Sequence, residues 1–210
     1  MENRQRCPWM FKVPEYLPYH DHEWGTPNHE DNIHFEFLVM ENFQAGLSWS
    51  TVFTKRENYR KSFAGFDPEK VARFTENKIE KLVQNPGIIR NRQKIKAVVN
   101  NAKRFLEVQN EFGSFDKYIW GFVNGKPIVK GWRRNSQIPV TNKASDNLSA
   151  DLKKRGFQFV GSTIMYAHMQ TLGLVNDHLV SCFRFEEIIR IYETQNSHRG
   201  RRAYKIGLKN

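Results

Sequence analysis

Two cysteines and two histidines near opposite ends of the chain have the residue types of a closed zinc site. Cys7 and His20 lie near the N-terminus, and His178 and Cys182 lie toward the other end. A helix there would place His178 and Cys182 on one face, since residues four apart are neighbours on a helix. Two thiolates and two imidazoles form a tetrahedral set that structural zinc prefers. The spacing leaves open two free thiols beside unrelated histidines. Three other histidines compete as ligands: His22, His29 and His34.

One carboxylate and several aromatic rings could recognise a flat, positively charged molecule. Glu41 follows the apolar run 37–40, and a carboxylate in such a helix must be paired, hydrogen-bonded or lining a cavity. Aromatic rings attract a cation, and stacking on a nucleic-acid base is worth about 1–3 kcal/mol. The alternative is a set of core aromatics with a salt-bridged Glu41. The rings lie in the N-terminal third of the chain: Trp9, Tyr16, Tyr19, Trp24 and Trp49.

A turn bounded by two glycines could hold a DNA strand. Lys153, Lys154 and Arg155 precede it, and the backbone N–H groups of the helix that follows are suited to a phosphate. The alternative is an ordinary helix connection with a glycine at the helix end. The basic turn over 86–94 has the same ambiguity. The candidate DNA-binding residues are Gly156, Phe157, Gln158, Phe159, Val160, Gly161 and Ser162.

The bulk composition is that of a basic globular protein. The net charge is +11, from 33 Lys and Arg against 22 Asp and Glu, which favours a polyanionic partner. Apolar residues make up 39% of the 210 residues, which argues against disorder. No apolar run is long enough to cross a membrane, and the N-terminus lacks a signal-peptide core. We therefore expect a cytoplasmic protein whose cysteines are metal ligands or free thiols.

The pattern of apolar residues predicts an all-α fold of roughly seven to nine helices. Strand signals are weak, although a short hairpin is expected around Asn124 and Gly125 within an irregular stretch over 124–142. The last helix is expected to start near Asn176 or Asp177. The other expected helices cover 31–46, 90–110, 145–156 and 162–173, and expected N-caps are Asp67, Thr75 and Ser114.

Several longer motifs occur in one order and cover the chain from Cys7 to Cys182. They are Cys-Pro-Trp at 7–9, Tyr-His-Asp-His-Glu-Trp-Gly at 19–25, Glu-Asn-Phe-Gln-Ala-Gly-Leu-Ser-Trp at 41–49, Lys-Arg-Glu-Asn-Tyr at 55–59, Gly-Ile-Ile-Arg-Asn-Arg-Gln-Lys-Ile at 87–95, Lys-Lys-Arg-Gly-Phe-Gln-Phe-Val-Gly-Ser-Thr at 153–163 and Gly-Leu-Val-Asn-Asp-His at 173–178. With these motifs the sequence resembles the type I DNA-3-methyladenine glycosylases, members of the helix-hairpin-helix glycosylase superfamily.

The resemblance implies a domain over 1–194 with two closely packed helical lobes and a base pocket between them. The tail over 195–210 lies outside the resemblance, and its basic, polar composition predicts that it is mobile. The resemblance also implies a monofunctional enzyme that flips 3-methyladenine out of double-stranded alkylated DNA and hydrolyses its N-glycosidic bond, releasing the free base. We expect a monomer with no membrane partner. The implied residues are Glu41 for catalysis and base recognition; Tyr19, Trp49, Trp9 and Trp24 for base binding; and Cys7, His20, His178 and Cys182 for one structural Zn²⁺.

Two positions depart from the family pattern. Asn42 stands where the family usually has glycine, so we expect a changed pocket floor beside Glu41. His168 stands where an aromatic residue, usually phenylalanine, is expected, and this predicts altered packing behind the hairpin. Asp177 precedes a metal ligand, so we expect it to support that ligand or cap a helix rather than act in catalysis. No lysine at the hairpin is a clear candidate for lyase chemistry.

Two alternatives remain at this stage. One is a non-catalytic helix-hairpin-helix protein that binds DNA or senses lesions, which Asn42 beside Glu41 keeps open. The other is a glycosylase for a different alkylated or deaminated base. Identifying the bases released from methylated DNA would distinguish all three.

Overall fold

The computed structural model describes the backbone of residues 4–206 and the side chains of residues 4–195. The chain divides into two compact units. The first unit consists of Met1–Pro27, Pro127–Ile138 and Gln170–Asn210, and the second of Asn28–Lys126 and Pro139–Met169. The predicted domain limit at 194 stays a prediction. Close packing of two lobes around a base pocket stays a prediction.

The fold is all-α, as predicted, but it has more helices than expected. The described residues contain eleven α-helices, against the predicted seven to nine. The helices that were not expected are short: α1 (Tyr16–His22), α3 (Trp49–Phe53) and α4 (Arg56–Ser62) are each seven residues or fewer. An apolar repeat needs more turns than that to become visible in a sequence. The short helix expected after Asp67 is present as α5 (Pro68–Ala72).

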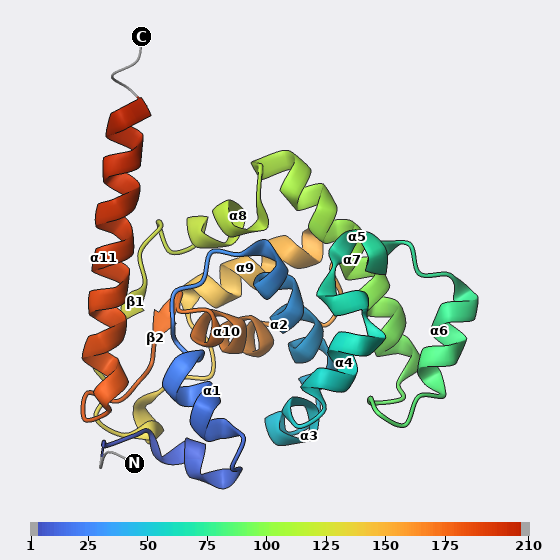
Figure 1. The fold of residues 1–210 in the computed structure, drawn as a ribbon, viewed down its shortest axis with the longest axis horizontal. Helices are drawn as coiled ribbons and strands as arrows, with labels where there is room; N and C mark the ends of the chain where they lie inside the picture. Colours follow the sequence, from blue (N-terminus) through green and yellow to red (C-terminus); the bar gives the residue numbers. More distant parts are fainter. Residues whose placement is uncertain (1–3, 207–210) are drawn as a thin grey trace. The chain divides into compact units, whose positions relative to one another are not determined.

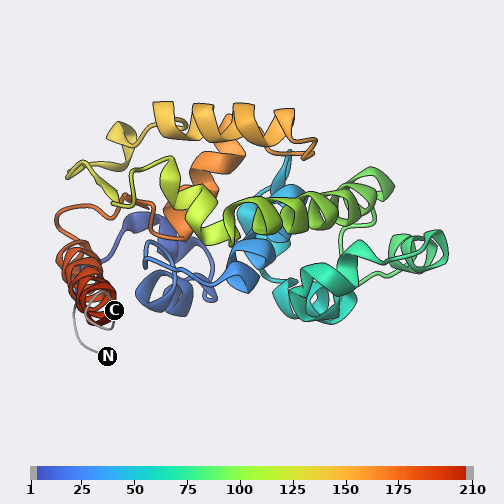
Figure 2. The ribbon, with the colours of Figure 1, turned by 90° about the horizontal axis from the view of Figure 1, so that it is seen from above.

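The second unit is built around α7 (Arg92–Phe112), the long green helix in Figure 2. It packs against α2 (Asp31–Gln44), α5, α6 (Glu76–Val83) and α8 (Phe115–Gly121). Helix α2 is buried without interruption from His34 to Phe43, although this stretch includes four polar residues: His34, Glu36, Glu41 and Asn42. Two further helices, α9 (Lys143–Lys154) and α10 (Ser162–Thr171), flank the glycine-bounded turn.

Local capping explains where several of these helices begin. The side chains of Asp67, Thr75 and Ser114 each accept a hydrogen bond from the backbone N–H three residues further on, which confirms the three predicted N-caps. Helix α2 starts at Asp31, as expected, but its cap residue, Glu30, makes no side-chain cap bond. The Asp31 carboxylate instead accepts from the N–H groups of Phe115 and Asp116, at the start of α8.

The first unit joins both ends of the sequence. It contains the 3₁₀ helix η1 (Pro8–Lys12), α1 (Tyr16–His22) and α11 (Phe183–Ile206), together with two short strands (Figure 1). Strand β1 (Ile128–Val129) pairs in parallel with β2 (Val175–Asn176). The N–H of Phe183 donates to the Gln5 carbonyl oxygen at 2.9 Å. Backbone bonds thus connect the N-terminal segment to the start of α11.

Two expectations for this part of the chain are wrong. The turn at Asn124 and Gly125 does not close a hairpin, because the Gly125 N–H donates to Trp120 and ends α8. Strand β2 occupies the place where the last helix was expected to begin, and α11 starts only at Phe183. This helix continues past 194 to Ile206, and the mobility of the tail over 195–210 stays a prediction.

Within the described residues, none of the helices is both long and apolar enough to cross a membrane.

Candidate active site and metal centre

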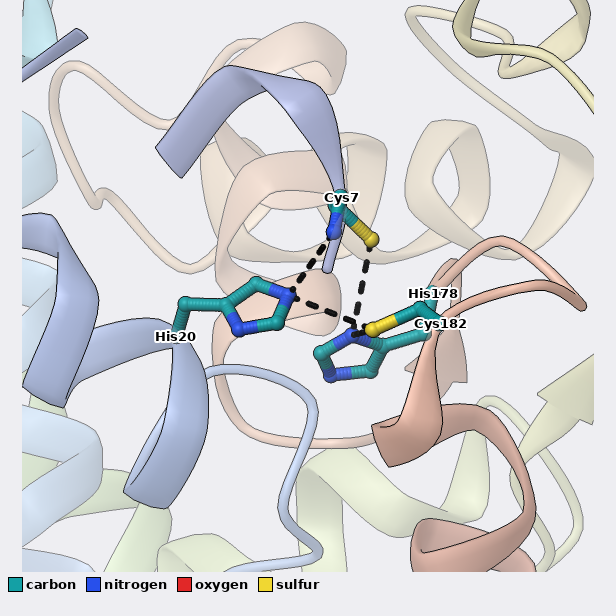
Figure 3. A group of neighbouring side chains, drawn as sticks. All are labelled: Cys7, His20, His178 and Cys182. Carbon is teal, nitrogen blue, oxygen red and sulfur yellow. Dashed lines mark hydrogen bonds between the residues drawn. The ribbon is translucent and has the colours of Figure 1, made fainter. Parts of the chain in front are cut away.

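The four predicted metal ligands come together in the first unit, where all four are buried (Figure 3). Their ligand atoms lie within 4.8 Å of one another. The Sγ of Cys182 is 3.5 Å from His20 Nε2 and 3.6 Å from His178 Nδ1, and the Sγ of Cys7 is 3.7 Å from His178 Nδ1. A tetrahedral site with bonds of about 2.0–2.3 Å requires ligand separations of about 3.3–3.8 Å. The three Sγ–N distances match that geometry, and all four ligand atoms lie within 4.8 Å of one another, so the cluster could hold a metal ion.

The other nitrogen of each histidine is already engaged, which leaves the correct nitrogen for a metal. His20 Nδ1 lies 2.8 Å from Asp21 Oδ1, and the Asp21 carboxylate in turn accepts from Arg6. His178 Nε2 lies 3.0 Å from the Trp24 carbonyl oxygen. Such contacts fix the ring orientation and raise the basicity of the ligating nitrogen. Competing histidines are not part of the cluster: His22, His29 and His34.

The chain geometry around the cluster is specific. At Gly25 φ is +78°, and a Cβ there would lie 2.9 Å from His178 Nε2. Glycine therefore permits both the left-handed backbone and the close approach of the imidazole. The pKa of Cys182 is lowered by its hydrogen bond with Cys7 and then by those with His178 and His20. Cys182 is thus readily converted into the thiolate that metals bind.

The expectation that a helix places His178 and Cys182 on one face is wrong. These residues do not share a helix face, because they lie in the irregular segment between β2 and α11. Two backbone hydrogen bonds shape that segment. The Cys182 N–H donates to the Leu179 carbonyl oxygen within a turn, and the Val180 N–H donates to the distant Trp132 carbonyl oxygen. The ligand set predicted from residue types is nevertheless brought together.

Three of the predicted base-binding rings form one cluster beside the metal ligands. The Trp9 ring makes edge contacts with Tyr19 and Trp24, at centroid distances of 6.3 and 4.9 Å. It also contacts His20 at 5.5 Å, and Trp24 contacts His178 at 4.6 Å. The Tyr19 hydroxyl lies 3.1 Å from Thr171 Oγ1. The cluster that could hold a metal therefore also positions these rings.

The fourth ring and the acidic residue belong to the second unit. Trp49 is the first residue of α3, which Ser48 caps, and its half-buried ring packs on Phe37 and Phe53. Glu41 lies on α2 and is 1% exposed. Sequence reasoning required a partner for this carboxyl group. The structure supplies His168 of α10, whose Nδ1 lies 2.7 Å from Glu41 Oε2.

The contact with His168 is the feature that sequence reasoning missed. His168 was expected to change packing behind the hairpin, yet it touches the candidate catalytic residue directly. Among the described residues, Glu41 Oε1 has no hydrogen-bond partner. Burial raises the pKa of Glu41 well above its usual range and lowers the pKa of His168 to about 3. The signal for this contact in the sequence was a histidine within an otherwise largely apolar helix, where it needs a polar partner.

Asn42, the other departure from the family pattern, turns toward α7. Its Nδ2 donates to the Lys94 carbonyl oxygen at 3.0 Å. The Lys94 ammonium donates to the carbonyl oxygens of Phe43 and Ala45, at the end of α2. Each helix thus donates a side-chain hydrogen bond to the backbone of the other. The hydrogen bond of the Asn42 side chain does not involve Glu41.

The glycine-bounded turn is held from inside through its carbonyl groups. Asn101 of α7 donates to the Gln158 carbonyl and accepts from the Gln158 N–H, at 2.9 and 2.8 Å. Asn100 donates to Gly156 O, and Ser149 donates to Val160 O. The first N–H groups of α10 have no partner within their own helix. The turn thus engages its acceptors internally, which suits the binding of an anion.

Asp177 has a structural position. Its two carboxylate oxygens accept from Trp132 Nε1 at 2.7 Å and from Gln170 Nε2 at 2.9 Å. It links the segment before β2 to the loop after β2, next to His178. Asp177 lies six residues before the start of α11 and so does not cap it, and its expected support of the ligand His178 stays a prediction.

Neighbouring side chains bind the carbonyl groups of the glycine-bounded turn, and the N–H groups at the start of the following helix remain for a phosphate. Helix-hairpin-helix proteins hold DNA in this way. With the helical architecture, this turn defines the class of protein: a helix-hairpin-helix DNA glycosylase fold. Residues 9–185 match the family model described as methyladenine glycosylase. The chain therefore belongs to the methyladenine glycosylase family.

Known proteins agree with this assignment. The chain is 50% identical to DNA-3-methyladenine glycosylase 1 of Escherichia coli (strain K12) over 178 residues, covering 85% of this chain and 95% of that protein. A crystal structure of 3-methyladenine DNA glycosylase I superposes with a TM-score of 0.83 at 48% identity, covering 85% and 98%. A complex of a variant enzyme with 3-methyladenine superposes with a TM-score of 0.82 at 38% identity, covering 85% and 96%.

Replacing Asn42 tests whether this departure affects the pocket or the scaffold. We expect Asn42→Ala to lose about 0.5–1.5 kcal/mol of stability, the usual net value of one hydrogen bond, and to keep its kcat/KM for base release. Urea unfolding and the release assay measure the two effects. A large fall in kcat/KM without a loss of stability would instead place Asn42 in base recognition.

Proposed function

We propose that this protein is a DNA repair glycosylase that hydrolyses the N-glycosidic bond of 3-methyladenine in alkylated DNA. The observation that carries the proposal is Glu41, a buried carboxyl group with one unpartnered oxygen in a chain of this family. Methylation at N3 makes adenine cationic, and cleavage releases it as a neutral base. A carboxylate opposite the cation gains most where water is excluded.

The roles of the other candidates follow from their chemistry. Glu41 hydrogen-bonds the edge of the flipped base and stabilises the developing positive charge on the sugar, and water attacks the sugar carbon. Tyr19 and Trp49 stack on the base, while Trp9 and Trp24 support Tyr19. The half-buried position of Trp49 and the edge contacts around Trp9 support this division.

The enzyme acts without a lysine nucleophile. Lys94 is the buried lysine near the hairpin, with its ammonium 5.9 Å from the Phe159 ring centroid. That ammonium donates to Phe43 O and Ala45 O, which hold it at the end of α2, and in this protonated form it has no lone pair with which to attack a sugar. This supports monofunctional hydrolysis. The non-catalytic alternative has no specific observation in its favour.

The turn Gly156–Ser162 grips one strand of double-stranded DNA through its backbone. Gly156 has φ +85° and Phe159 has φ +56°, so the turn uses the left-handed region at two positions. Strain at a residue other than glycine is typical of functional sites. The net charge of +11 supports binding to a polyanion. Monomeric state and cytoplasmic location stay predictions.

Zinc is the metal that we assign to the Cys7–His20–His178–Cys182 cluster. Two thiolates, two imidazoles and tetrahedral spacing suit Zn²⁺ best among common ions. Protein groups fill all four positions, so the ion supplies structural cross-linking. The chemistry falls to Glu41 and the aromatic rings.

The base-release assay tests the function directly. We expect the purified protein to release 3-methyladenine from methylated DNA and to release 7-methylguanine poorly, as resolved by chromatography. Glu41→Gln keeps the size and the contact to His168 but removes the charge. It should lower kcat/KM about tenfold to a hundredfold, since a hydrogen bond to a charged group is worth about 1.5–3 kcal/mol. Absence of freed 3-methyladenine from the unaltered protein would refute the proposal.

The hairpin assignment predicts a loss of DNA affinity when the turn is loosened. Asn101→Ala removes two hydrogen bonds to Gln158, each worth about 1 kcal/mol, so affinity for an undamaged duplex should fall roughly tenfold or more. Fluorescence anisotropy at one fixed salt concentration measures it. Asn110→Ala, an exposed change on the same helix, is the control. Equal affinity of the two variants would contradict the assignment.

Zinc content and its effect on stability can be measured together. We expect roughly one zinc per chain. Cys182→Ala should lose the metal and, if the ion is at a thousandfold excess over its Kd, about 4 kcal/mol of stability, or roughly 8–16 °C in Tm. His22→Ala removes an exposed histidine outside the cluster and should change neither value. The site would be excluded if the purified protein contained no zinc and its Tm did not change when a chelator was added.

A further inference from the structure

A cluster of titratable groups lies behind Glu41 and has no role in the function so far described. Glu41 and His34 come from α2, His168 from α10 and Asp116 from α8. His34 and His168 are 0% exposed, and their rings lie 5.8 Å apart with an angle of 33° between their planes. Two imidazoles buried side by side are costly unless they serve a purpose.

The hydrogen bonding of the pair Glu41–His168 is incomplete. One contact is made, between Glu41 Oε2 and His168 Nδ1 at 2.7 Å. Among the described residues, Glu41 Oε1 and His168 Nε2 have no hydrogen-bond partner. The Oε1 atom is therefore the one acceptor of this carboxyl group that remains for a ligand.

The pair can hold its proton in two places without changing its net charge. A protonated Glu41 beside a neutral imidazole and a carboxylate beside an imidazolium both sum to zero. Burial favours the first arrangement, because it raises the pKa of Glu41 and lowers that of His168. A cation placed at Oε1 favours the second, because it attracts the carboxylate directly.

We propose that His168 is a positioning residue that accepts the proton of Glu41 when the cationic base binds, so that the carboxylate forms without release of a proton to solvent. This inference rests on the proposed role of Glu41. In the transfer the O–H bond at Glu41 Oε2 breaks, and its proton forms an N–H bond with the lone pair of His168 Nδ1. When the neutral base leaves, the proton returns. No further reactant is needed.

One charged group in the surroundings partly offsets the burial that keeps His168 neutral. His34, the other imidazole that faces it, has its pKa lowered by burial and is therefore neutral. Behind His34, Asp116 Oδ1 lies 3.6 Å from His34 Nε2 and 2.7 Å from His29 Nδ1. Burial opposes ionisation of Asp116, but the hydrogen bond from His29 prevails and lowers its pKa to about 2. The Asp116 carboxylate thus lies on the far side of the neutral His34 ring. From there its negative charge stabilises a positive charge on His168.

The pH dependence of kcat/KM for release of 3-methyladenine tests the proposal. In the unaltered enzyme the pair keeps its proton, so kcat/KM should be flat from about pH 5.5 to 8.5. In His168→Phe the carboxyl group must lose its proton to solvent before it holds the cation. Below the pKa of Glu41, kcat/KM should then rise about tenfold for each pH unit.

Two further variants separate proton acceptance from packing. His168→Gln keeps a polar side chain next to Glu41 but does not accept a proton, and its profile should slope as that of His168→Phe does. His34→Phe removes the neighbouring buried imidazole, which does not hydrogen-bond Glu41, and its profile should stay flat. Flat profiles in both His168 variants, or a slope in His34→Phe as well, would overturn the assignment.

A measurement on the unaltered protein keeps the test decisive if the variants do not fold. Nitrogen-15 NMR of the His168 ring should show a neutral imidazole in the free protein. It should show an imidazolium in the complex with 3-methyladenine at an acidic pH where that base is protonated. A neutral ring in this complex would refute the proposal. Release of 3-methyladenine that Glu41→Gln impairs would leave the proposed function standing in that case.

Discussion

The arrangement of the first unit depends on the convergence of four ligand atoms from sequence-distant segments. Cys7 and His20 meet His178 and Cys182 at distances that a tetrahedral ion requires. The same two imidazoles contact the Trp9 and Trp24 rings. Any displacement of the ligands therefore moves the aromatic cluster that contains Tyr19. The cluster that could hold a metal ion and the candidate base-binding rings are linked here by direct ring contacts.

The second unit places a carboxyl group in an environment that opposes its ionisation. Helix α2 is buried along ten successive residues, and Glu41 lies within that stretch. The helix is tied to α7 by two contacts: Asn42 Nδ2 donates to the Lys94 carbonyl oxygen, and the Lys94 ammonium donates to the Phe43 carbonyl oxygen near the end of α2. Glu41 is satisfied on one oxygen only, by His168. Among the described residues, Asn42 Oδ1 and Glu41 Oε1 are thus neighbouring buried acceptors without a partner, one on the scaffold side of α2 and one on the candidate catalytic residue.

Features that depend on a few adjacent residues could be predicted from the sequence, and those that depend on tertiary contacts could not. The N-caps at Asp67, Thr75 and Ser114 are local, and all three are confirmed. The ligand set followed from residue types, yet the helix proposed to pair His178 with Cys182 does not exist, because coordination needs converging atoms rather than a particular backbone. His168 and Glu41 are 127 residues apart in sequence, so only the fold could show that they touch.

The uncharged state of the Glu41–His168 pair also bears on selectivity. Moving the proton from Glu41 to His168 separates two charges in a buried site, which costs free energy unless a third charge compensates. A cationic methylated base provides that charge, whereas unmodified adenine does not. Normal adenine would meet a protonated carboxyl group and gain only a neutral hydrogen bond, and bonds to charged groups are roughly twice as strong. The pair therefore discriminates by charge before any chemistry occurs, which a permanently ionised carboxylate held by a fixed cation would do less well.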